Sequence, residues 1–346
     1  QAVYNIVDSA FVGNMRSGSE SALNALTLVF PVQMLMVAVA IGTGVGTNAL
    51  LARTLGQGNG KKASKVAGNS LFLGVLIYVI CLLFGIFGVK AYISSQTVDP
   101  EVISMGTDYL RICCVIAFGI IFFSLFEKLL QATGRSLYST IGQVVGAVVN
   151  IILDPVFIFG LKMGVVGAGI ATVIGEMAAG ILCLLYLRRL QSVQLEKGAL
   201  RPTWPVLKMI LQLGFPSLLT QGLTALVQIV LNNLMRVYGE ASIYGSDMAL
   251  SVYGMMMKVY QLAHSMFVGV SSAIQPINGY NFGAKNYQRV RQTYRLATGI
   301  AVVISAVWWL VYMVFSRQIA GLFVADNQLY FDCTQHCFRL YMMAFF

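Results

Sequence analysis

Asn150-Ile-Ile-Leu-Asp154-Pro155 is a polar interruption of a largely apolar run that extends from Gly142 to Leu161. The amide and the carboxylate are four positions apart, so on a helix they share one face and lie one turn from each other. The proline has no amide hydrogen and would leave the carbonyl of Ile151 without its helical partner. The stretch therefore predicts a helix on which a carboxylate, a carboxamide and a freed carbonyl oxygen lie at one depth.

The composition is that of a membrane protein. Hydrophobic residues make up 58% of the 346 residues, charged residues make up 10%, and the mean hydropathy is +0.76. A soluble domain is about 25% charged. Apolar runs recur that are long enough to cross a bilayer core of about 30 Å. We therefore expect an all-α polytopic membrane protein in contact with the lipid bilayer, in which an ionisable group such as Asp154 is a functional candidate.

Ten membrane spans are expected, and the ends of the sequence cut the first and the last, so this number is a minimum. The expected spans are 1–14, 26–54, 66–93, 102–132, 138–161, 165–187, 209–238, 246–280, 296–315 and a tenth from Leu329. The longest polar segment, residues 190–207, follows the sixth span. It predicts a cytoplasmic linker between an N-lobe, residues 1–189, and a C-lobe, residues 208–346.

The charges are distributed as in a multi-pass protein. The net charge is +10, but the 23 basic residues do not gather on one domain, which argues against a nucleic-acid partner. Most of them, Lys128 and Arg135 included, fall in or beside the loops that follow even-numbered spans, whereas the other loops carry acids. Positive loops stay in the cytoplasm. We therefore expect a plasma-membrane protein whose N-terminus is cytoplasmic.

The sequence lacks the motifs of a metal site or an enzyme. The six cysteines lie mostly in apolar runs without a CxxC pair, and Cys333 and Cys337, with His336 between them, have no further ligand pair. There is no HExxH motif, no Asp-rich diphosphate motif, and there are two histidines in all. We expect reduced cysteines, no structural metal and no enzymatic activity.

The two halves of the chain form an internal repeat. A shift of 227 residues brings equivalent residues into register, as in Gly42 with Gly269, Gly56 with Gly283, and Asn5 with Asn232. Six spans separate equivalent positions, so the halves point the same way, and transporters built like this bind substrate between the halves. Asp8 falls opposite Met235, and no acid lies near the counterpart of Asp154. The carboxylates therefore belong to the first half.

Two further polar patterns are candidates for a cavity wall. Gln1, Tyr4, Asn5 and Asp8 share one face of the first span, which would look toward protein or a water-filled cavity, or would be solvated near the helix end. In the second half, the eighth span carries Tyr253, Met257, Tyr260, His264 and Ser271. Tyr and Met suit a wall that accepts varied apolar and cationic ligands, but packing between helices is the alternative for each of them.

Six stretches carry a resemblance that covers essentially the whole chain in order. They are Tyr4-Asn-Ile-Val-Asp8-Ser-Ala-Phe-Val-Gly13, Leu55-Gly-Gln-Gly, Gln131-Ala-Thr-Gly134-Arg135, Asn150-Ile-Ile-Leu-Asp154-Pro155, Gly164-Val-Val-Gly-Ala-Gly-Ile-Ala-Thr172 and Gly279-Tyr-Asn-Phe-Gly283. Together they resemble the multidrug and toxic compound extrusion (MATE) transporters, and among these the DinF-like prokaryotic branch. The resemblance implies twelve helices in two parallel six-helix lobes, of which about ten are present.

The resemblance also implies a site. Asp8, Asn150, Asp154 and Thr172 match the polar cluster linked to cation coupling, where Na⁺ would bind if it is the coupling ion. Gln1, Tyr4, Gln143 and Glu176 match positions that face the same cavity. Glu176 departs from the neutral residue expected there. It would add a third acid that alters the drug charge preference or the ion stoichiometry, or it would be paired locally and silent.

The implied function is ion-coupled export. Such transporters expel amphipathic, often cationic compounds in exchange for H⁺ or Na⁺ by alternating access, with no other cofactor, and we expect a monomer. Asp8 and Asp154 would hold a proton or share Na⁺, because two nearby acids resist ionising together. The alternative is a lipid-linked oligosaccharide flippase of the same superfamily, which would favour a more cationic cavity than the few intramembrane cations Arg111, Lys258 and Arg339 provide.

Overall fold

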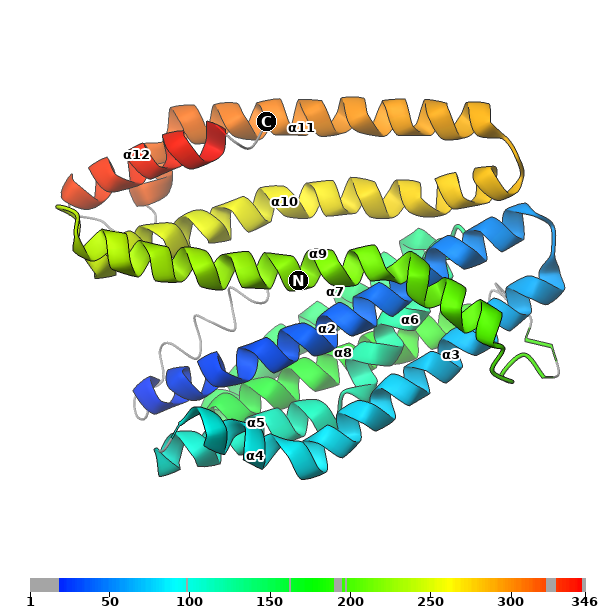
Figure 1. The fold of residues 1–346 in the computed structure, drawn as a ribbon, viewed down its shortest axis with the longest axis horizontal. Helices are drawn as coiled ribbons and strands as arrows, with labels where there is room; N and C mark the ends of the chain where they lie inside the picture. The colour runs from blue at the N-terminus through cyan, green and yellow to red at the C-terminus, as the bar shows by residue number, and fades with distance from the viewer. Residues whose placement is uncertain are drawn as a thin grey trace. The chain divides into compact units, whose positions relative to one another are not determined.

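The computed structural model describes residues 19–97, 99–161, 163–189, 195–196, 198–321 and 328–343, and these residues form helices joined by short connections (Figure 1). The helices are α2 (Ser19–Gly56), α3 (Gly60–Leu83), η1 (Phe84–Gly88), α4 (Val89–Gln96), α5 (Pro100–Val115), α6 (Phe118–Ala132), α7 (Ser136–Pro155), η2 (Val156–Gly160), α8 (Gly164–Arg189), α9 (Trp204–Glu240), α10 (Ser246–Gly283), α11 (Tyr287–Gly321) and α12 (Gln328–Met343). Elements η1 and η2 are single π-helical turns. The predicted all-α class is confirmed, and the first predicted span lies outside the described residues.

Seven stretches of the described residues are long and apolar enough to cross a membrane. They are Leu28–Gly56, Gly60–Gln96, Pro100–Ala132, Ser136–Ile158, Gly169–Arg189, Trp204–Glu240 and Tyr287–Ile319. These stretches match the second to seventh and the ninth predicted spans. The fourth predicted span is two helices, α5 and α6, with a break at Ile116–Ala117 that contains neither proline nor glycine.

The described residues form two compact units. The first contains the described residues up to Gly222 together with Gln275–Tyr287, and the second contains Leu223–Ile274 together with the described residues from Gln288 on. In the second unit, α10, α11 and α12 share a core, in which buried Tyr312 donates a hydrogen bond to the Val259 carbonyl at 3.0 Å. The first unit holds the acids that the sequence singled out.

The described part of the predicted linker is attached to the first unit. The Asn69 side chain of α3 is buried, and its Nδ2 donates to the carbonyls of Ala199 and Arg201, both at 3.3 Å. Its Oδ1 accepts from the Thr203 amide at 2.7 Å. One amide side chain thus satisfies backbone groups of an irregular segment, as buried backbone requires. The division into an N-lobe and a C-lobe at this segment stays a prediction.

Helices α7 and α8 pack most extensively within the first unit because their backbones meet at glycines. A Cβ atom added to Gly146 would lie 2.8 Å from the Gly175 oxygen, and one added to Gly175 would lie 2.7 Å from the Gly146 oxygen. Membrane helices approach this closely where small residues line the contact. The added Cβ of Gly175 would also lie 3.1 Å from Cβ of Asn150, so this contact brings the polar residues of α7 against α8.

A second set of glycines packs α2 against parts of α9 and α10 in the same unit. A Cβ on Gly46 would overlap the Ile210 carbonyl oxygen. One on Gly56 would overlap that of Tyr280, and one on Gly283 would overlap that of Arg53. Gly56 and Gly283 are 227 residues apart, and so are Arg53 and Tyr280. The last two contacts therefore exchange under the predicted repeat, which gives this crossing a local twofold symmetry.

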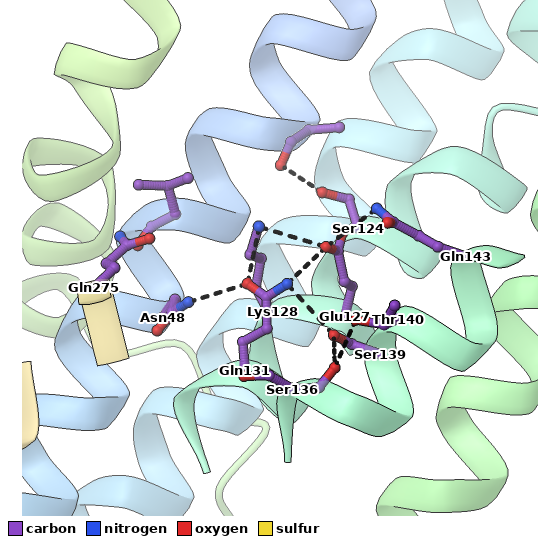
Figure 2. Close-up of polar contacts among 12 residues, drawn as sticks. Asn48, Ser124, Glu127, Lys128, Gln131, Ser136, Ser139, Thr140, Gln143 and Gln275 are labelled. Carbon is purple, nitrogen blue, oxygen red and sulfur yellow. Dashed lines mark hydrogen bonds and ion pairs between the residues drawn. The ribbon is translucent and has the colours of Figure 1, made fainter. Parts of the chain in front are cut away.

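A buried polar network joins α2, α6 and α7 (Figure 2). On α6, Lys128 Nζ lies 3.5 Å from Glu127 Oε1 and donates to Gln131 Oε1 at 2.9 Å, while Gln131 Nε2 donates to Glu127 Oε1 at 2.7 Å. Asn48 of α2 donates to Gln131 at 3.5 Å, and Gln143 of α7 donates to Glu127 at 3.4 Å. The two charges neutralise each other, and neutral amides bond to them.

The network corrects the sequence interpretation of Lys128, which assigned this residue to a basic loop. That assignment was wrong, because α6 continues to Ala132 and the Lys128 side chain is 8% exposed. The stem lies against α2, where a Cβ added to Gly44 would be 2.9 Å from Cγ of Lys128. Glu127 and Gln131, on the same turns, satisfy its ammonium group.

We predict that Gly46→Ala destabilises the protein. The added methyl group would overlap a backbone carbonyl that cannot rotate away, and overpacking of this kind costs about 1–3 kcal/mol. The apparent Tm of the purified protein in detergent should fall. The matched control is Gly222→Ala in α9, where an added Cβ meets nothing within 4 Å. That variant should keep or raise the Tm, and equal losses in both variants would contradict the close contact.

We predict that Lys128→Met destabilises the protein more than the double variant Glu127→Gln/Lys128→Met. The single variant leaves a buried carboxylate without its cation, which typically costs about 3–5 kcal/mol, whereas removing both charges is often close to neutral. Thermal unfolding of both single variants and the double variant gives the coupling energy. If the losses of the single variants simply add in the double variant, the pair contributes no coupling.

Candidate functional site

Three of the predicted ion-coupling residues meet between α7 and α8. Asp154 is 0% exposed and Asn150 is 2% exposed. The Asn150 Nδ2 group donates to Asp154 Oδ1 at 3.3 Å and to Thr172 Oγ1 of α8, also at 3.3 Å. The spacing of four residues on α7 produces the first contact, and the glycine contact between the two helices produces the second. Asp8, Gln1 and Tyr4 lie outside the described residues.

Two oxygen atoms of this cluster lack a partner. Asp154 Oδ2 and Asn150 Oδ1 are buried, and neither has a hydrogen-bond partner within the described part of the chain. Buried polar atoms are nearly always satisfied, and leaving one unsatisfied costs about 1–3 kcal/mol. Both atoms are oxygens, the donor type that protons and hard metal cations prefer. The cluster is therefore built to receive a group that supplies positive charge.

The helix changes its winding immediately after the carboxylate. α7 ends at Pro155, and η2 continues the chain as a π-helical turn in which the Leu161 amide donates to the Val156 carbonyl at 2.8 Å. A proline removes one helical hydrogen bond and its ring crowds the preceding turn, and a wider turn accommodates this defect. The predicted irregularity at Pro155 is confirmed, and π-helical turns are frequent at functional sites.

A cavity of about 70 Å³ lies in the first unit. α8 contributes Thr172 and Glu176, α5 contributes Tyr109 and Cys113, and α2 contributes Gln33. Gln33 Nε2 donates to Tyr109 Oη at 3.3 Å and to Cys113 Sγ at 3.2 Å. Thr172 therefore contacts both the coupling cluster and the cavity.

Sequence reasoning missed Gln33, although a signal was present. This residue is a lone amide in the apolar stretch Val29–Ala40, just as Asn150 is a lone amide in its own helix. The same argument that selected Asn150 applies to it, because a polar side chain in a membrane span faces protein or a cavity.

The other predicted substrate-binding residues lie elsewhere. Gln143 is exposed and bonds to Glu127 in the network of Figure 2. Tyr253, Met257 and Tyr260 lie on α10 in the core of the second unit. Met257 Sδ accepts from Tyr341 Oη at 3.6 Å, and the Tyr260 ring stacks on His264 with centroids 5.6 Å apart. Their role in binding substrate stays a prediction.

Comparisons with known proteins agree on one family. The MatE family profile matches residues 1–156 and 216–343. The chain is 26% identical over 325 residues to the multidrug export protein MepA of Staphylococcus saprophyticus subsp. saprophyticus and 28% identical over 332 residues to that of Staphylococcus haemolyticus. In both cases the match covers 94% of this chain and 70% of the relative.

Solved structures agree with the sequence matches. A multidrug resistance MATE family transporter of the MOP superfamily in an outward-facing conformation superposes with a TM-score of 0.88 at 27% identity, over 100% of this chain and 75% of that chain. A crystal structure of MATE in complex with MaD3S gives a TM-score of 0.90 at 26% identity, over 99% of this chain and 74% of that chain. The chain, a multi-pass membrane protein, belongs to the MatE family.

Proposed function

We propose that this chain forms most of an ion-coupled antiporter that exports amphipathic, often cationic compounds by alternating access. The observation that carries the proposal is the buried Asp154 carboxylate, which shares one hydrogen bond with Asn150 and has one oxygen unpartnered among the described residues. A carboxylate in an apolar bundle needs a positive partner. Within the described residues no basic side chain pairs with it, so H⁺ or Na⁺ is the partner we assign.

The coupling step follows from the position of the cluster. Asp154 and Thr172 are bridged by Asn150, and Thr172 also lines the cavity of the first unit. Binding of a cation at Asp154 would change the charge beside the cavity and so the affinity for a charged substrate. In the proposal Asp8 is the second acid of this site, as the resemblance implies. Ion and substrate would then bind in turn, which is the basis of antiport.

The family and the relatives support export as the direction of transport. The chain belongs to the MatE family, and the MepA proteins it resembles are named multidrug export proteins. Placement in the DinF-like branch rests on the Asn150–Pro155 motif and its neighbours. Moving Lys128 from a loop into α6 leaves exposed basic residues at the loops after spans two, four and six, among them Lys61, Arg135 and Arg188. We therefore keep a cytoplasmic N-terminus.

The flippase alternative has no support at the cavity. A site for lipid-linked anionic sugars would carry basic side chains. The described residues that line the cavity include Glu176 and contain no lysine, arginine or histidine. The charge of the cavity therefore suits cations.

We predict that Asp154→Asn abolishes gradient-driven export while the protein still folds. The amide keeps the shape and the hydrogen bond to Asn150 but cannot exchange a proton or balance Na⁺. Efflux of a cationic dye from vesicles under separately imposed H⁺ and Na⁺ gradients measures the loss and identifies the coupling ion.

The matched control is Asp108→Asn, which makes the same chemical change at an exposed position of α5. It should transport as the unmodified protein does. Size-exclusion chromatography and thermal unfolding show that both variants are folded. Full gradient-driven efflux by Asp154→Asn would overturn the proposed function.

A further inference from the structure

Glu176 is a carboxylate whose charge nothing in the described structure neutralises. It lies on α8 one turn after Thr172, and its side chain lines the cavity of the first unit and is partly accessible there. Among the described residues it makes no hydrogen bond and no ion pair. The other buried glutamate of this unit, Glu127, is paired with Lys128 and two amides. An acid held in an apolar cavity without a counter-ion favours an occupant that brings positive charge.

The polar groups of the cavity favour a donor of hydrogen bonds. The Gln33 Nε2 group is used on Tyr109 and Cys113, so its Oε1 is the atom left to interact with an occupant. The Glu176 carboxylate likewise accepts and does not donate when ionised. The remaining wall is apolar and includes Met36 and Val37. A cation that carries N–H groups satisfies both acceptors, whereas a quaternary or phosphonium cation satisfies neither.

The size of the cavity limits what enters it. Its volume is about 70 Å³, whereas pockets that enclose a whole drug-sized ligand measure about 300–1,000 Å³. The cavity therefore accommodates a head group, with the body of the substrate outside. Protonated amine, amidine and guanidine groups have the required charge, donors and size.

We propose that Glu176 is a specificity-determining residue that binds the protonated nitrogen head group of the substrate and does not bind the coupling ion. The inference rests on the proposed function and deepens it by naming the substrate class. It separates two acids of the same unit by their contacts. Asp154 is 0% exposed and bonded to Asn150, whereas Glu176 opens onto the cavity and has no bond to that cluster.

The first experiment measures binding without any ion gradient. Purified full-length protein is titrated with DAPI, a fluorescent diamidine, and with tetraphenylphosphonium, a cation without N–H groups. Because a hydrogen bond to a charged group is strong, Glu176→Gln should raise the Kd for DAPI by at least about tenfold. The Kd for tetraphenylphosphonium should change by less than about threefold, since this cation offers no donor. Glu176→Asp, which keeps the charge, should recover part of the DAPI affinity.

The matched control is Glu240→Gln, the same change at an exposed position at the end of α9. It should leave both affinities unchanged. Equal losses for DAPI and tetraphenylphosphonium in Glu176→Gln would overturn the inference, because they would indicate a general effect on the cavity. A Glu176→Asp variant that binds DAPI no better than Glu176→Gln would also overturn it.

The second experiment measures transport and distinguishes substrate binding from ion coupling. Glu176→Gln should still export tetraphenylphosphonium under an ion gradient, with the same number of ions per substrate, while its KM for DAPI export rises. A changed ion stoichiometry would overturn the inference and make Glu176 a coupling residue. The binding experiment needs no gradient, so it tests Glu176 even if gradient-driven export, and with it the proposed function, fails in the unmodified protein.

Discussion

The backbone contact between α7 and α8 determines where the polar groups of the first unit lie. At Gly146 and Gly175 the two helices approach so closely that an added Cβ on either glycine would lie less than 3 Å from the carbonyl oxygen of the other. This approach places Asn150 within 3.3 Å of the Thr172 hydroxyl oxygen. In a membrane, helices associate through packing and interhelical hydrogen bonds rather than through the hydrophobic effect. The small residues and the polar bridge therefore act together, and the site is part of what holds the two helices.

The sequence was sufficient where the determinants are local. A spacing of four residues predicted that Asn150 and Asp154 share a face, and a missing amide hydrogen predicted the defect at Pro155, where α7 gives way to a π-helical turn. The repeat of 227 residues predicted equivalent positions in the two halves. The exchange of contacts between Gly56 and Gly283 is consistent with that repeat. Each of these inferences needs a few residues and no knowledge of distant neighbours.

The sequence was insufficient where a side chain depends on another helix. Lys128 was assigned to a loop because basic residues usually end a span, yet its stem packs against Gly44 of α2 and its ammonium group bonds to Gln131. The break at Ile116 between α5 and α6 has no proline or glycine to mark it. Gln33 became a candidate when the structure placed it beside Tyr109 and Cys113. In each case the determinant is a contact between segments far apart in the chain.

The first unit contains three buried or half-buried acids, and their surroundings differ in a way that separates structure from function. Glu127 has a cation at 3.5 Å and two amide donors, so its charge is balanced within the protein. Asp154 has one amide donor and an unpartnered oxygen, and Glu176 has neither. A buried charge that the protein does not balance must be balanced by something that binds and leaves. Transport by exchange requires two such ligands, an ion and a substrate, and the unit provides two acids of this kind at the two ends of one polar chain, from Asp154 through Asn150 to Thr172 and then to Glu176.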